Sequence, residues 1–153
     1  MKKAIALLLA LVMVFALCAC GGGGDSASGD KVVKIGVFEP ASGDSGAGGK
    51  KEMLGMQYAN QETPTVEIGG ETYKVELVYS DNGSDSAKAV SAASKLVNEK
   101  VSLVLGSYGS GVSIAASDTF KQAGIPAIGV TCTNPNVTAG NSHYFRICFL
   151  DPF

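Results

Sequence analysis

Short apolar segments rich in β-branched residues alternate along this chain with segments long enough to form a helix. This alternation constrains the fold more than any other feature of the sequence. The connections leave no room for tight hairpins, so we expect parallel strands covered by helices on both faces. The sequence predicts an α/β fold with a doubly wound, mostly parallel sheet, whose main strands lie at 31–38, 101–106, 125–130 and 143–150.

The segments between these strands carry helix and hairpin signals. Residues 50–61 predict a short helix, in which Gly55 is expected to be a point of close packing. Asp85 is a candidate N-cap for a second helix that runs to about residue 100. Segment 65–80 predicts a hairpin that turns at Gly69 and Gly70.

The clearest helix begins near Ser110. Its apolar residues recur at helical spacing and form one continuous stripe, made by Val112, Ala115, Ala116, Thr119, Phe120 and Ala123. Gly124 follows the stripe and is expected to end the helix at the C′ position, where glycine is favoured.

The first residues have the features of an export signal. Lys2 and Lys3 precede an apolar run at 4–17, which is shorter than the roughly 20 residues of a membrane span but suits a signal peptide. We therefore expect residues 1–19 to be a signal peptide. Its removal takes away two lysines and no acid, so the net charge moves from −2 to −4. This mild acidity argues against a nucleic-acid partner.

The end of this signal resembles a bacterial lipoprotein lipobox, in the sequence Leu17-Cys18-Ala19-Cys20. The resemblance implies that Cys20 becomes the first residue and carries the lipid. Residues 20–30 are then a lipid-anchored flexible tether that spans on the order of 17 to 19 Å. We expect an exported protein anchored on the extracytoplasmic face of the cell membrane, with ordinary secretion as the alternative.

In an open parallel sheet, ligands bind beyond the carboxyl ends of the strands. That rule selects the loops at 39–49, 106–111 and 131–136, which are rich in glycine and hydroxyl groups. The acids of these loops, Glu39 and Asp44, form no pair in the sequence. The only histidine, His143, lies elsewhere, so no Ser/His or Cys/His arrangement for catalysis is present.

Metal and nucleotide sites have no support in the sequence. There is no CxxC motif and no Cys/His cluster of the kind that binds zinc. The stretch DSGAGGKK departs from the Walker A pattern because Asp44 replaces the first glycine and Lys51 replaces Ser or Thr. The GxGxxG dinucleotide pattern fails in the same loop. No cofactor and no metal are expected.

Neutral donors at this edge favour recognition of a small anion. Ser110 is the expected N-cap of its helix, where unpaired amides and the helix dipole attract negative charge. Thr131 and Thr133 leave the neighbouring strand toward the same edge. Simple turn formation explains the two threonines equally well, so the residues alone leave both roles open.

From about Lys34 to its end, the chain resembles the leucine/isoleucine/valine-binding family, the substrate-binding lipoproteins of branched-chain amino acid ABC transporters. The matching features are the loop at 106–111, Ile125-Pro126, Thr133-Asn134-Pro135 and the exit from Phe145-Arg146 to Asp151-Pro152-Phe153. The resemblance implies a two-lobed periplasmic-binding-protein fold. Residues 31–153 would then be the N-terminal ligand-binding lobe, with the chain ending before the second lobe.

The resemblance also implies a function and partners. It implies a non-enzymatic solute-binding protein of an ABC importer, whose partners are an amino acid, the permease subunits and the membrane. The ligand's α-carboxylate would be held by Ser110, Thr131 and Thr133. Arg146 is expected to be structural. A single lobe lacks the contacts to the rest of the ligand and cannot close, so weak binding is expected of it.

Some positions depart from the family's pattern. Gly48 stands where members often have an aromatic residue, and Gly83 and Gly109 stand where some have a disulfide. The side-chain specificity therefore stays open. A disulfide between Cys132 and Cys148 and a pair of free thiols are both open. A receptor-type domain, an enzyme on a flavodoxin-like sheet and a purely structural surface lipoprotein are the alternative functions.

Overall fold

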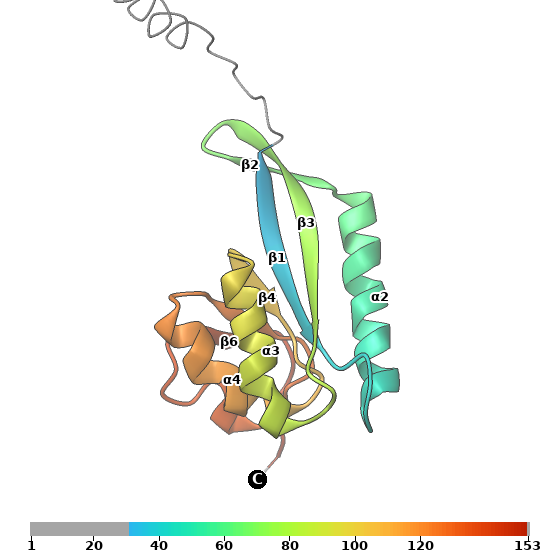
Figure 1. Ribbon diagram of the computed structural model, residues 1–153, viewed down its shortest axis with the longest axis vertical. Helices are drawn as coiled ribbons and strands as arrows, with labels where there is room; N and C mark the ends of the chain where they lie inside the picture. Colours follow the sequence, from blue (N-terminus) through green and yellow to red (C-terminus); the bar gives the residue numbers. More distant parts are fainter. Residues whose placement is uncertain (1–30, 153) are drawn as a thin grey trace, which may run out of the picture.

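The computed structural model describes residues 31–152 (Figure 1). The signal peptide, the lipid attachment at Cys20 and the tether expected from the sequence lie outside these residues. Within the described part of the chain, no helix combines the length and apolarity needed to cross a membrane.

Within residues 31–152, six strands form one sheet in the order β2-β3-β1-β4-β5-β6. All neighbouring strands pair in parallel except β2 and β3, which form the antiparallel hairpin expected at Gly69 and Gly70. Both glycines have positive φ, at 61° and 81°, as a tight hairpin turn requires. The strands are β1 (Val32–Glu39), β2 (Thr65–Ile68), β3 (Glu71–Asp81), β4 (Leu103–Leu105), β5 (Ala127–Gly129) and β6 (Tyr144–Arg146).

In the part of the chain that the structure describes, three α-helices and one short 3₁₀ helix connect the strands: α2 (Gly46–Glu62), α3 (Ser86–Asn98), α4 (Ser110–Gln122) and η1 (Pro135–Val137). Helix α2 is longer than the expected segment 50–61 because its first turn includes the glycines of the preceding loop. Asp85 is confirmed as the N-cap of α3, since its carboxylate accepts a hydrogen bond from the Ala87 amide at 2.8 Å.

Strands β4 and β5 are shorter than expected because the residues before them belong to helix ends. After α4, the Gly124 amide donates to the Lys121 carbonyl and the Ile125 amide donates to the Phe120 carbonyl, each at 3.0 Å. These two bonds form a Schellman motif, and the φ of 69° at Gly124 confirms its expected C′ position. Residues 96 to 101 close α3 with the same pair of bonds, from the Lys100 amide to the Val97 carbonyl and from the Val101 amide to the Leu96 carbonyl.

The core lies between the sheet and helices α3 and α4. Phe38 from β1 and Phe120 from α4 are fully buried and meet edge to face, with ring centroids 5.4 Å apart. Leu96 from α3 and Val104 from β4 are buried in the same cluster. Of the apolar stripe expected on α4, Val112, Ala116 and Phe120 are buried in this core, whereas Ala123 is exposed at the end of the helix.

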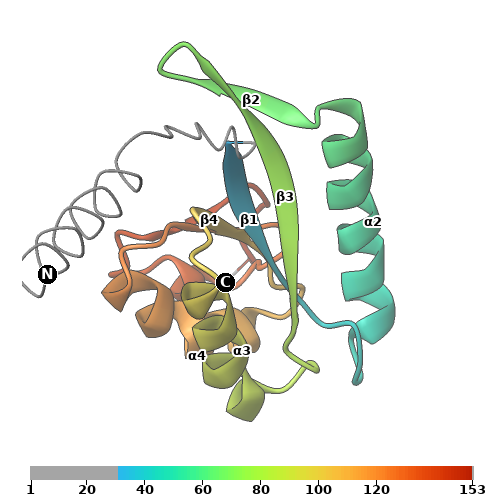
Figure 2. The same cartoon turned by 45° about the horizontal axis from the view of Figure 1, so that its top comes forward.

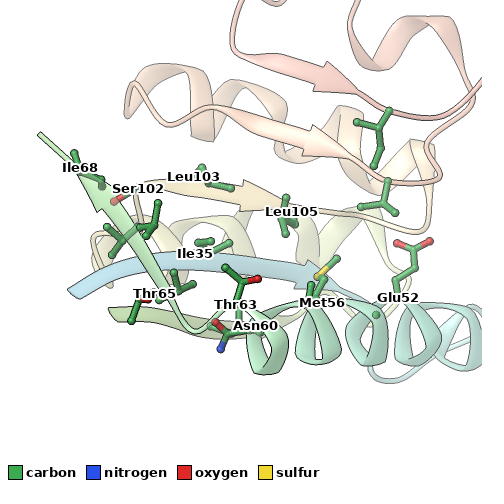
Figure 3. Close-up of a pocket in the computed structure, with 18 residues that line it drawn as sticks. Ile35, Glu52, Met56, Asn60, Thr63, Thr65, Ile68, Ser102, Leu103 and Leu105 are labelled. Carbon is green, nitrogen blue, oxygen red and sulfur yellow. The ribbon is translucent and has the colours of Figure 1, made fainter. Parts of the chain in front are cut away.

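Among the elements of residues 31–152, the opposite face of the sheet carries only α2, which stands alongside β1 and β3 (Figures 1 and 2). Both faces thus carry a helix, as the doubly wound prediction requires, but their coverage is unequal. A groove of about 820 Å³ remains between α2 and the sheet (Figure 3), and it is lined by apolar side chains that include Ile35, Leu77, Leu103, Leu105, Val130 and Ile147.

The close packing expected at Gly55 is found instead at Gly49, in the first turn of the same helix. A Cβ atom on Gly55 would have no atom within 4 Å, so the expectation for Gly55 is wrong. A Cβ atom on Gly49 would collide with the carbonyl oxygen and ring of Pro40. Gly49 is therefore the residue that lets α2 approach the end of β1.

Matched alanine substitutions in α2 are expected to change stability in opposite directions. Gly49→Ala should lower the free energy of unfolding by about 1 to 3 kcal/mol, because the backbone of Pro40 must move. Gly55→Ala should raise it by about 0.5 to 1 kcal/mol, because the site is open and alanine favours the helix. Urea denaturation of both variants is the measurement. Equal effects of the two substitutions would contradict this account of α2.

Candidate functional site

Three loops meet at the carboxyl edge of the sheet, as the rule for parallel sheets predicts. They follow β1, β4 and β5 and contain the residues selected from the sequence. The Asn134 amide donates to Ser110 Oγ at 3.3 Å, so the start of α4 and the loop after β5 are in direct contact. Thr133 precedes Asn134 and lies in this contact region, whereas the Thr131 side chain turns toward α2.

Ser110 is not the N-cap of α4. The N-cap is Gly109, and no side chain caps the helix there. Ser113 and Ser107 hold the turn instead: Ser113 Oγ donates to the Gly109 carbonyl at 3.1 Å, and the Ser107 amide donates to Ser113 Oγ at 3.2 Å. Ser110 becomes the first helical residue, and its hydroxyl is directed to the neighbouring loop.

Several donors at this edge have no partner inside the described part of the chain. They are the backbone amides of Ser110, Gly111, Thr131 and Thr133, together with the hydroxyl protons of Ser110 and Thr133. The first two amides belong to the N-terminal turn of α4, where the helix dipole favours an anion. The arrangement can hold a small anion without a cationic side chain.

Arg146, at the end of β6, organises the loop after β5. Its Nη1 donates to the carbonyls of Cys132 and Thr133 at 3.0 and 3.1 Å. Its Nη2 donates to the Pro135 carbonyl at 3.1 Å and to Thr138 Oγ1 at 2.8 Å. The expected structural role of Arg146 is confirmed, because all four of its acceptors belong to this loop and the short helix after it.

Two glutamates at the same edge form a site that the sequence did not indicate. Glu39, the last residue of β1, is 1% exposed and accepts a hydrogen bond from the Tyr108 amide at 2.7 Å. Glu52 points from α2 toward the sheet (Figure 3) and accepts from the Thr131 hydroxyl at 2.5 Å. The pKa of Glu39 is raised to about 10, mainly by burial and in addition by the neighbouring carboxyl group of Glu52, while the bond from the Tyr108 amide acts in the opposite direction.

Tyr108 occupies the space that an aromatic residue at position 48 would need. A Cβ atom on Gly48 would lie 2.5 Å from two ring atoms of Tyr108. An aromatic ring from the loop after β4 thus lies against the first loop at Gly48. The sequence does not indicate this contact, because the two positions are distant in the chain.

Cys132 and Cys148 are free thiols, so the disulfide that the sequence left open as an alternative is not formed. Cys132 is buried, and its sulfur contacts the Ser107 carbonyl at 2.6 Å and Ser113 Oγ at 3.0 Å. Burial raises the pKa of the Cys132 thiol to about 11. The sulfur therefore belongs to the hydrogen-bonded turn before α4.

Comparison with known proteins identifies the family to which this sequence is similar. The family model described as periplasmic binding protein matches residues 32–149. Leu/Ile/Val-binding protein homolog 2 of Brucella abortus is 32% identical over 120 residues, which are 78% of this chain and 32% of that protein. The chain thus spans about a third of the length of the curated relatives it matches.

Solved structures agree with this match in both sequence and fold. A leucine binding protein LivK from Thermotoga maritima is 35% identical with a TM-score of 0.72, over 78% of this chain and 33% of that one. The branched-chain amino acid transporter substrate binding protein LivJ from Streptococcus pneumoniae, solved with isoleucine, is 33% identical with a TM-score of 0.70, over 78% and 34% of the two chains. The fold, the site at the sheet edge and the matched residues together show that this chain belongs to the periplasmic binding protein family.

Proposed function

We propose that this protein is the extracytoplasmic solute-binding component of an ABC importer and that the described lobe holds the α-carboxylate of an amino acid. Branched-chain amino acids are the first candidates, because the relatives carry names of leucine, isoleucine and valine binding. The observation that carries the proposal is the group of unpaired donors at Ser110, Gly111, Thr131 and Thr133.

Neutral donors suit a protein that must release its ligand. A carboxylate already forms charge-assisted hydrogen bonds with neutral donors, so a cationic side chain would add the attraction of a second charge and would slow release. The positive end of the α4 dipole supplies the attraction for a carboxylate without a cation. Tyr108 lies beside Gly48 at the same edge and would contact the rest of the ligand.

The anchor and the partners belong to the same proposal. The N-terminal sequence supports lipid attachment at Cys20, which would hold the protein at the membrane near the permease subunits. A receptor-type domain would bind ligand in the same way. Uptake of labelled leucine by cells that lack the protein separates the two, because loss of a receptor leaves transport intact.

Ligand binding is tested by isothermal titration of the complete natural protein, without its lipid, with leucine, isoleucine and valine. Ser110→Ala and Thr133→Ala should each weaken binding about tenfold to a hundredfold, because a hydrogen bond to a charged group contributes about 1.5 to 3 kcal/mol. Ser117→Ala is the matched control, since its hydroxyl donates within α4 to the Ile114 carbonyl. Unchanged binding in Ser110→Ala and Thr133→Ala would overturn the assigned site.

A further inference from the structure

Glu39 is a buried carboxyl group with one oxygen that has no partner. Its Oε2 accepts from the Tyr108 amide, while its Oε1 makes no hydrogen bond within residues 31–152. An ionised carboxylate in such a place would lose its hydration without compensation. The position therefore demands either a donor for Oε1 or a proton on it.

Among the described residues, Glu52 also has one carboxyl oxygen without a hydrogen-bond partner. Its Oε1 accepts from the Thr131 hydroxyl, and its buried Oε2 also lacks a partner in the described structure. Neither glutamate has a cation as its salt-bridge partner among the described residues. The two carboxyl groups instead lie close enough to each other for one proton to bridge them.

We propose that Glu39 and Glu52 share one proton and act as a positioning pair that fixes the loops of the ligand-binding edge. A proton on Glu39 becomes the donor that both unpartnered oxygens lack. The resulting chain of bonds runs from the Tyr108 amide through Glu39 and Glu52 to the Thr131 hydroxyl. It joins β1, the loop after β4, helix α2 and the loop after β5.

The pair has a consequence for an anionic ligand, and this part rests on the proposed function. Two ionised glutamates would place two negative charges at the edge that receives the carboxylate. Sharing a proton halves that charge. It also keeps Tyr108 and Thr131 in place, so that the amides beside them stay directed to the ligand. Glu39 and Glu52 are positioning residues, because they act through Tyr108 and Thr131.

The proton on Glu39 makes stability depend on pH in a defined direction. The folded protein holds this proton more tightly than the unfolded chain, so rising pH favours unfolding between the ordinary glutamate value of 4.5 and about 10. Besides Glu52, the groups that face Glu39 are Cys132 and Tyr144, and burial raises the pKa of both, so they stay protonated across neutral pH.

Glu39→Gln is the decisive variant. A glutamine amide donates to Glu52 and accepts from the Tyr108 amide, so it copies the protonated acid and cannot titrate. Urea unfolding of the full chain from pH 6 to 9 should show the folded-to-unfolded ratio of the wild type falling by up to about tenfold per pH unit relative to Glu39→Gln. Glu76→Gln, an exposed change of the same kind on β3, should follow the wild type. Parallel curves for the wild type and Glu39→Gln would overturn the shared proton.

Two further measurements guard against a variant that fails to fold. The infrared spectrum of the wild type at neutral pH should contain the carbonyl band of a protonated carboxylic acid, and Glu39→Gln should lack it. Glu52→Gln keeps the acceptor for Thr131 and removes the neighbouring charge, so the pH dependence should move to lower pH. Absence of the band in the wild type would also overturn the proposal.

Ligand titration separates this proposal from the proposed function. At neutral pH, Glu39→Gln should bind leucine as the wild type does, whereas Glu39→Leu should lose at least tenfold in affinity. Equal affinities of Glu39→Gln and Glu39→Leu would overturn the positioning role. A wild type that shows the infrared band but binds no amino acid would overturn the proposed function and leave the shared proton standing.

Discussion

Replacing Phe120 by alanine is expected to lower the free energy of unfolding by about 3 to 5 kcal/mol. Phe120 is fully buried and closes the core between α4 and the sheet, where its ring meets Phe38. The loss combines the transfer of a large apolar side chain with a cavity that the close-packed surroundings cannot fill. Domains of this kind have only about 5 to 15 kcal/mol of stability in total, so the variant should lose a large fraction of it.

The chain offers a matched control for this prediction. Phe149 lies beyond β6 and is 77% exposed, so Phe149→Ala removes the same group from a site that buries little of it. Its effect should stay within about 0.5 kcal/mol. Urea denaturation of both variants, followed by circular dichroism, gives the comparison. A loss below 1 kcal/mol in Phe120→Ala would contradict the core described above.

Replacing Arg146 by methionine is expected to disorder the loop after β5 and to abolish ligand binding. The guanidinium donates four hydrogen bonds to that loop and the short helix after it. Hydrogen bonds to a charged group contribute about 1.5 to 3 kcal/mol each and do not add fully, so we expect a loss of about 2 to 4 kcal/mol in stability. Ligand affinity should fall at least a hundredfold, because Thr131 and Thr133 lie in the same loop.

Two controls define the cause of that loss. Arg146→Lys keeps the charge but lacks the planar fork, so it should recover only part of the stability and affinity. Lys74→Met removes an exposed cation from β3 and should change neither quantity. Urea denaturation and titration with leucine measure both effects in the complete protein. An Arg146→Met variant that binds leucine normally would show that the loop holds its shape without the guanidinium.

Features that depend on interactions between nearby residues could be predicted from the sequence, and features that depend on more distant interactions could not. The hairpin at Gly69 and Gly70, the N-cap at Asp85 and the helix end at Gly124 were all predictable, because each depends on bonds among residues a few positions apart. The strand lengths were not, because Val101 and Ile125 serve as helix-end residues as well as apolar ones. Only the hydrogen bonds of the Schellman motifs decide between these roles.

The candidate site shows the same division. The parallel topology and the hydroxyl-rich loops located the edge of the sheet and selected Ser110, Thr131 and Thr133. The side-chain roles needed the folded chain. Ser110 is not the N-cap because Ser107 and Ser113 form the hydrogen bonds of the turn before α4. The Thr131 hydroxyl donates to Glu52, which is 79 positions away in the sequence.

By itself, the sequence determined the alternation of strands and helices, the parallel sheet and the edge where a ligand would bind. It did so because periodic patterns and turn residues act locally and need no partner. Only the tertiary structure decided that Glu39 meets Glu52, that Tyr108 fills the space over Gly48 and that Arg146 fixes the loop after β5. Each of these contacts joins separate elements, and a buried carboxyl group acquires its chemistry only from the neighbours that the fold brings to it.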